Sequence, residues 1–199
     1  MNNPNDKLSA LYNSYNTLIK PLIGEIEVRY ECIPVQLLNE IRAFNDHIAR
    51  YFNSSNDNNS EIQLTKANGH IERLILDCYK FLNVEFHKQL IKTFQKRTKN
   101  IDLTTISNGE FYIAYKKLIH QINKELKEAK LLETNENKVF SLNLYQNVYN
   151  SFIQLENLLN DNETHIIWSK AKFSINKLIK FLLWLAAAVA SGFVSKYFF

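Results

Sequence analysis

The sequence predicts an all-α protein, in which an antiparallel bundle of about five helices is followed by a single C-terminal transmembrane helix. Apolar residues recur at the three- and four-residue spacing of a helical face through most of the chain. Only four glycines and three prolines occur in 199 residues, too few for the many tight turns of a sheet protein. The last segment, 181–199, is strongly apolar. Together these observations indicate long helices and one membrane-spanning tail.

The first predicted helix covers about residues 6–32, where apolar side chains share one helical face. Asp6 is expected to cap its start, because a carboxylate accepts hydrogen bonds from the free N–H groups of a first turn. Pro21 and Gly24 are expected to kink this helix.

The second helix is expected to run from Pro34, whose fixed φ suits a first turn, to about Phe52. Residues 53–61 carry no apolar side chain and form the clearest predicted loop. A third helix follows over about 61–96, with Gly69 as its weak point.

Two further helices and the tail complete the prediction. The helices are expected over about 110–132 and 138–159, between polar breaks at 98–109, 134–137 and 160–164. The last helix is expected to run from Thr164 through the tail. The chain is therefore divided into a cytosolic helical-bundle domain (1–163), a basic juxtamembrane helix (164–180) and a transmembrane helix (181–199).

The tail has the length of a membrane span. A helix over residues 181–199 would be about 28 Å long, close to the roughly 30 Å hydrocarbon thickness of a bilayer. Its uncharged run, 181–194, has only fourteen residues. Runs of that length also occur in buried core helices. A core helix, or a helix that docks onto a partner, is therefore the alternative to a span.

Charges beside the tail predict its orientation. Lys170, Lys172, Lys177 and Lys180 precede the apolar run, and only Lys196 follows it. Because positive charge favours the cytoplasmic side, the N-terminal part is expected to stay in the cytosol. We therefore expect a single-pass protein of the inner (cytoplasmic) membrane, with lipid as one partner.

Composition and motifs exclude several classes of function. Cys32 and Cys78 are expected to be reduced core residues rather than a disulfide. The five histidines are widely spread, so no metal site is predicted, and no cofactor is expected. The sequence has neither a glycine-rich phosphate loop nor a hydrolase nucleophile motif, which argues against a conventional enzyme.

One motif in the second predicted helix carries a resemblance. Arg42 and His47 lie five residues apart in the segment EIRAFNDH. This Arg-x4-His pattern resembles the signature of the HEPN superfamily of small all-helical proteins, many of which are RNases. The resemblance implies that Arg42 and His47 of two protomers meet in a dimer cleft. There the histidine would be the general acid or base, and the arginine would stabilise charge on phosphate.

The motif departs from the family at Ala43, where a polar residue is usual. The alternative is a surface arginine paired with Asp46, one helical turn away. We therefore expect no catalytic residue. A membrane-tethered RNase using Arg42 and His47 on an RNA substrate is the second hypothesis.

A polar stripe lies on the third predicted helix. His70, Arg73, Asp77 and Lys80 share one face because their spacings are three, four and three. The stripe is either a solvated face with an Arg73–Asp77 pair or a ligand or interface site facing the Arg-x4-His motif.

The end of the same helix is basic. Lys92, Lys96 and Arg97 belong to this cluster. It is either a solvated helix end, which complements the helix dipole, or a site for the phosphate of a nucleotide or RNA.

Small residues recur four apart along the tail, which lets helix backbones approach closely and predicts a homo-oligomer. The expected contact and pore residues are Ala186, Ala190, Ser191, Gly192, Ser195 and Lys196. A ring of such helices would line a narrow ion channel. A passive anchor is the equal alternative.

A small helical domain with a membrane span and no enzyme motif resembles the membrane effectors of bacterial anti-phage and CRISPR-associated defence. The resemblance implies a pore-forming or membrane-disrupting oligomer that causes abortive infection. Its cytosolic domain would sense a nucleotide second messenger or a regulatory protein. A third hypothesis is a tail-anchored adaptor with no activity of its own.

Overall fold

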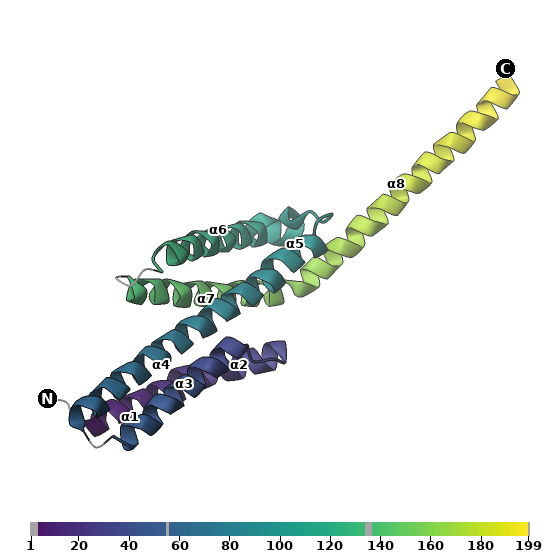
Figure 1. The fold of residues 1–199 in the computed structure, drawn as a ribbon. Coiled ribbons are helices and arrows are strands. Elements are labelled where there is room, and N and C mark those ends of the chain that lie inside the picture. Colours follow the sequence, from purple (N-terminus) through teal and green to yellow (C-terminus); the bar gives the residue numbers. More distant parts are fainter. Residues whose placement is uncertain (1–3, 55, 134–136, 199) are drawn as a thin grey trace. The chain divides into compact units, whose positions relative to one another are not determined.

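The structure, a computed structural model, describes residues 4–54, 56–133 and 137–198, and within these ranges it contains helices and connecting turns but no strand (Figure 1). The all-α prediction is confirmed. The predicted bundle helices and the tail helix are all present. Their boundaries differ from the predicted ones in several places, for local reasons.

The first helix is built from α1 (Pro4–Ser14), the π-helical segment η1 (Tyr15–Ile19) and α2 (Lys20–Tyr30). The predicted irregularity lies just before Pro21, where the Lys20 N–H donates to the Tyr15 carbonyl. Proline has no N–H to donate, and a wider π turn accommodates that loss. Gly24 lies within regular helix. The predicted cap at Asp6 is wrong, because the helix already begins at Pro4 and Asp6 lies in its first turn.

The next two helices begin at different points from those predicted. Pro34 precedes α3 (Val35–Phe52) with an extended ψ of 135° and is not its first residue. The long third helix joins α4 (Asp57–Phe86), η2 (His87–Thr93) and α5 (Phe94–Arg97). It starts inside the predicted loop, because the Asn56 side chain accepts from the Asn58 N–H at 3.0 Å and caps the first turn. The helix continues through Gly69 without a break.

The connection before the fourth long helix is a capped 3-10 turn. Asp102 caps the 3-10 segment η3 (Leu103–Gly109), and its carboxylate accepts from the Thr104 N–H at 3.0 Å. This segment leads into α6 (Glu110–Leu131), which precedes α7 (Lys138–Asp161). Most of the predicted break between these two helices, at 134–136, lies outside the described residues.

The chain forms two compact units, each made of segments distant in sequence. The first contains residues 1–86 and 124–150. In it, α3 lies along α4 (Figure 1). The spacing of apolar residues predicts an inward face for this long helix, and most of that face is at most 2 % exposed: Ile71, Leu74, Cys78, Leu82 and Phe86. Ile75, Phe81 and Leu90, which the same spacing places inward, are half-buried. The buried Asn83 side chain donates to the Tyr145 carbonyl at 2.9 Å and so ties α4 to α7.

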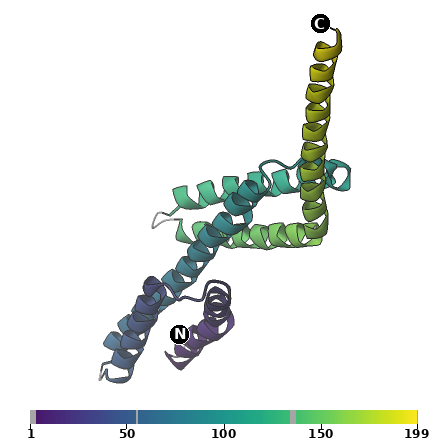
Figure 2. The ribbon, with the colours of Figure 1, turned by 90° about the vertical axis from the view of Figure 1, so that its right-hand side faces the viewer.

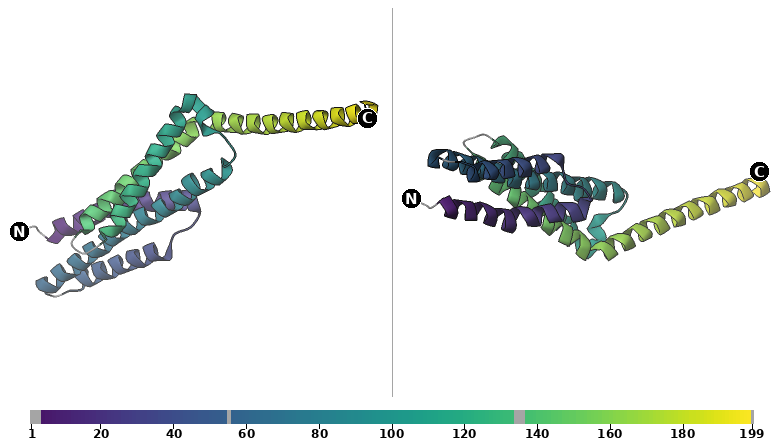
Figure 3. Two further views of the ribbon diagram at one scale, coloured as in Figure 1. Left: turned by 90° about the horizontal axis from the view of Figure 1, so that it is seen from above. Right: turned by 60° about the horizontal axis from the view of Figure 1, so that its bottom comes forward.

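The second unit contains residues 87–123 and 151–199. Its aromatic cluster joins α5 to α6, with the Phe94 ring 5.0 Å from that of Tyr115 and 6.4 Å from that of Phe111. It also contains α8 (Glu163–Phe198), which is separated from α7 by one residue. The predicted juxtamembrane helix and the predicted span are thus one continuous helix, which can be followed in Figures 2 and 3.

The two cysteines differ in environment, and both are free thiols. Cys78 is a buried core residue, as predicted. The same prediction for Cys32 is wrong, because α2 ends at Tyr30 and Cys32 lies exposed in the turn that follows. Glu31 turns the chain there, with a left-handed φ of 52°.

We expect a thiol reagent at pH 8 to label Cys32 and to leave Cys78 unmodified in the folded protein. Burial raises the pKa of the Cys78 thiol to about 12, so its reactive thiolate is scarce and also shielded from reagent. Mass spectrometry should find one label per chain, and two in urea. Labelling of Cys78 at the rate of Cys32 would contradict this packing of α4.

Candidate functional site

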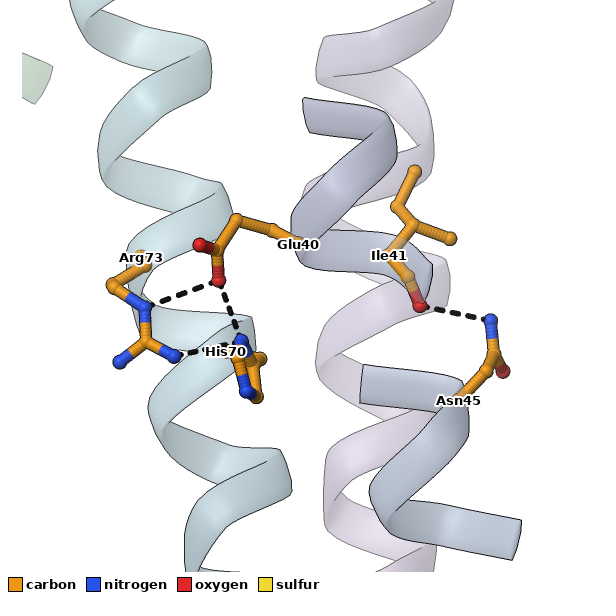
Figure 4. Close-up of polar contacts among 5 residues, drawn as sticks. All are labelled: Glu40, Ile41, Asn45, His70 and Arg73. Carbon is orange, nitrogen blue, oxygen red and sulfur yellow. Dashed lines mark hydrogen bonds and ion pairs between the residues drawn. The ribbon is translucent and has the colours of Figure 1, made fainter. Parts of the chain in front are cut away.

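A polar cluster joins α3 to α4 in the first unit. Glu40 of α3 accepts a hydrogen bond from Arg73 Nε at 3.1 Å, and its carboxylate lies 2.7 Å from His70 Nδ1 (Figure 4). His70 Nδ1 also lies 2.7 Å from Arg73 Nη2. A protonated Nδ1 donates to Glu40, whereas a bare Nδ1 accepts from Arg73. The Glu40 and His70 side chains are only 21 % and 17 % exposed, so these contacts are partly shielded from water.

The cluster extends along α3 to a second histidine. The His47 ring stacks on the His70 ring, with centroids 5.2 Å apart and planes at 26°. His47 Nδ1 lies 2.8 Å from the Gln63 side-chain oxygen and donates to it, because an amide oxygen can only accept. The buried Gln63 in turn donates to Asn59. The result is a connected chain of imidazole, carboxylate and amide groups between the two helices.

The predicted polar stripe on α4 has different partners from those expected. Arg73 pairs with Glu40, so the predicted Arg73–Asp77 pair is wrong. Lys80 pairs instead with Glu133, at 2.7 Å. His70 does face His47, as the second interpretation of the stripe expected. Sequence reasoning missed Glu40, although it lies seven residues before His47 and thus on the same face of one helix.

The two residues of the Arg-x4-His motif point in different directions within one chain. His47 is turned toward α4, whereas Arg42 is exposed. The expected pair between Arg42 and Asp46 is wrong, since Asp46 pairs with Arg50 at 2.7 Å. A catalytic meeting of Arg42 and His47 across two protomers stays a prediction.

Asp77 borders the cluster, and its charge is disfavoured there. Burial raises the pKa of its carboxyl. Glu40 and Glu133 act in the same direction, while Lys80 and Arg73 oppose them. A raised pKa in the folded state means that ionising Asp77 costs folding free energy above that pKa. Below the pKa that Asp77 has in the unfolded chain, its carboxyl is protonated in both states and this cost disappears.

We therefore expect Asp77→Asn to stabilise the protein at pH 7, with a gain that disappears as the pH falls below the unfolded pKa of aspartate. Urea midpoints of the full chain in neutral detergent at pH 7 and pH 3.5 measure this. Asp102→Asn is the matched control, since bonds from Thr104 lower the pKa of Asp102 and its loss should destabilise at pH 7. A gain in stability from Asp77→Asn that persists at pH 3.5 would contradict the raised pKa of Asp77.

The basic end of the third helix is brought together with α8 inside the second unit. Lys96 and Arg97 line a groove of about 560 Å³, which Lys170 and Lys177 of α8 also line. The predicted phosphate site thus gains two lysines that are distant in sequence. Lys92 is exposed and lies outside the groove lining.

Most of the described part of the tail helix is exposed. From Lys170 to Ser191 every side chain of α8 is exposed. Its described part, Glu163–Ser191, is long and apolar enough to cross a membrane. None of the residues in its most apolar stretch is buried. The core-helix alternative therefore does not apply. A span and a docking helix are the two interpretations that remain.

The predicted contact residues of the tail are described in part. Ala186, Ala190 and Ser191 are exposed, and the Ser191 hydroxyl donates to the Ala188 carbonyl at 2.8 Å. That bond satisfies the hydroxyl within its own helix, as an apolar environment requires. The side chains of Gly192, Ser195 and Lys196 lie outside the described residues.

Comparison with models of protein families found no match, and neither the curated proteins nor the solved structures gave one. The structure itself defines the class of this protein. It is an all-helical protein whose C-terminal helix is long and apolar enough to span a membrane.

Proposed function

We propose that this protein is an oligomeric effector of the inner (cytoplasmic) membrane. Its helical units receive a signal in the cytosol, and α8 crosses the bilayer and self-associates there. The observation that carries the proposal is the exposure of α8, on which every described side chain from Lys170 onward faces outward.

Exposed apolar side chains of this size require a covering. Leu183, Trp184 and Val189 are 65 %, 66 % and 54 % exposed. Soluble monomers rarely carry a contiguous apolar surface of this kind, and a bilayer removes it from water. A helix suits that environment because its backbone groups bond to one another. The lysines before Phe181 favour a cytosolic position for the helical units.

Small residues support self-association of the span. Ala186 and Ala190 lie one turn apart on α8 and are exposed, so another helix can approach the backbone closely. In the proposal, assembled spans form an ion channel or disrupt the bilayer. The setting is anti-phage defence by abortive infection, and a nucleotide or a regulatory protein is the signal. The protein itself is proposed to have no catalytic activity.

A span exchange tests the proposal. Residues 181–199 are replaced by an unrelated single span, and a membrane-potential dye is read after induction of the full chain. We expect the wild type to depolarise cells and the exchanged protein to leave the potential unchanged.

Two point variants refine that test. Gly192→Leu should abolish depolarisation because a large side chain separates the backbones, whereas Gly192→Ala, which keeps a small side chain at the same position, should leave it intact. If the exchanged protein keeps all activity, α8 is only an anchor and the protein is an adaptor. A wild type that never depolarises cells would overturn the effector role.

A further inference from the structure

The charged side chains that line the groove of the second unit all have the same sign. Four cationic side chains line it, two from the end of the third helix and two from α8: Lys96, Arg97, Lys170 and Lys177. No acidic side chain is among the described residues that line it. Charges of one sign from segments more than 70 residues apart thus line one groove, an arrangement that raises the local concentration of anions.

The α8 side of the groove carries both cationic and apolar side chains and is apolar at the end nearest the span. Phe173, Leu178 and Phe181 line it along the stripe that also carries the two lysines. Phe181 is the first residue of the uncharged run 181–194. A ligand that fits this lining has an anionic end for the cations and an apolar part directed toward the span.

The end of the groove nearest the span lies at the depth of the headgroup layer of a bilayer. Lys177 lies four residues before Phe181, about 6 Å along the helix axis. The polar layer on each side of the hydrocarbon core is about 5–8 Å thick. Lys177 therefore lies at the level of lipid phosphates, and Lys170 lies farther toward the cytosol.

We propose that this groove binds the headgroup of an anionic phospholipid, with Arg97 and Lys177 at the phosphate, Lys96 and Lys170 adding to the positive field, and the acyl chains beginning at Phe181. This inference rests on the proposed insertion of α8. Arg97 suits the role because its planar guanidinium can bind two phosphate oxygens at once. A free nucleotide would use the same cations but would leave the apolar lining uncovered.

The test uses the full chain in neutral detergent micelles and a fluorescent phosphatidylglycerol, with fluorescent phosphatidylcholine as the neutral probe. We expect saturable binding of phosphatidylglycerol with at least tenfold preference. Lys170→Gln with Lys177→Gln should weaken binding about thirtyfold, as the loss of two cations near a lipid phosphate predicts. Lys96→Gln with Arg97→Gln should have a similar effect.

The matched control is Lys172→Gln with Lys180→Gln. It removes the same charge from the same stretch of α8, but neither residue lines the groove. We expect less than a threefold loss. Equal losses in the two α8 pairs would show only general attraction to the membrane and would overturn the site. Competition by inorganic phosphate, or by a nucleotide, at concentrations near the lipid affinity would also overturn it.

Flotation with pure phosphatidylcholine vesicles separates this inference from the proposed function. Wild type and all variants should float, because insertion depends on the apolar run. If the wild type does not float, the proposed span fails. If it floats but shows no lipid preference, only the groove assignment fails.

Discussion

Replacing Leu185 and Val189 together with arginine is expected to release the protein from the membrane. Both side chains are exposed on α8, and both lie inside the uncharged run 181–194. An arginine at the centre of a spanning helix costs about 2.5–3.5 kcal/mol, whereas leucine and valine each favour insertion by a few tenths. The double change therefore opposes insertion by about 6 kcal/mol, enough to reverse the partition.

The measurement is the fraction of protein that stays with membranes after an alkaline carbonate wash. Ile175→Arg with Ile179→Arg is the matched control, with the same spacing on the same helix. These isoleucines are also exposed, but they lie before the uncharged run, among lysines that reach the interface. The control should stay in the membrane. Release of both pairs, or of neither, would show that the run 181–194 is not the inserted segment.

Glu40→Ala is expected to lower the free energy of unfolding by about 2–3 kcal/mol, the range for removing charge-assisted hydrogen bonds. Glu40 accepts from Arg73, lies 2.7 Å from His70 Nδ1 and is 21 % exposed. Its removal leaves both residues of α4 without their carboxylate partner in a partly shielded position. Urea unfolding of the full chain in neutral detergent at pH 7, followed by circular dichroism, measures the effect.

Glu72→Ala provides the comparison. Glu72 is exposed and accepts from Asn68, one turn away on α4, at 2.6 Å. A solvated contact of this kind contributes less than about 0.5 kcal/mol. If Glu40→Ala costs no more than Glu72→Ala, the α3–α4 cluster is solvated and does not hold these helices together. Glu40→Gln should fall between the two, because it keeps an acceptor but loses the charge.

The helices were predictable because each carries its apolar face in its own sequence. The face of α4 from Ile71 to Phe86 is the buried one, as its spacing indicated. Errors occurred where one residue sets a boundary. Asn56 caps α4 inside a segment that looked like a loop, and Glu31 ends α2 in a left-handed conformation that no glycine signalled. A side-chain cap or the backbone conformation of one residue sets these helix boundaries, and the spacing of apolar residues does not reveal either.

Partners across helices were less predictable than the helices themselves. Spacing places Glu40 and His47 on one face of α3, but it does not say which residues of α4 they meet. The sequence therefore suggested an Arg73–Asp77 pair within one helix, and the structure has an Arg73–Glu40 pair between two. The groove was hidden for the same reason, because its lysines on α8 and its cations at the end of α5 are distant in sequence.

The passage from α7 to α8 is a single residue. α7 ends at Asp161 and α8 begins at Glu163. Asn162 between them is fixed at both sides, donating to the Leu158 carbonyl at 2.9 Å and accepting from the Ile166 N–H at 3.0 Å. A connection of one residue has only two soft backbone dihedral angles. Any change in the angle between α7 and α8 therefore has to come from the backbone dihedral angles of this one residue, against the two hydrogen bonds that hold it.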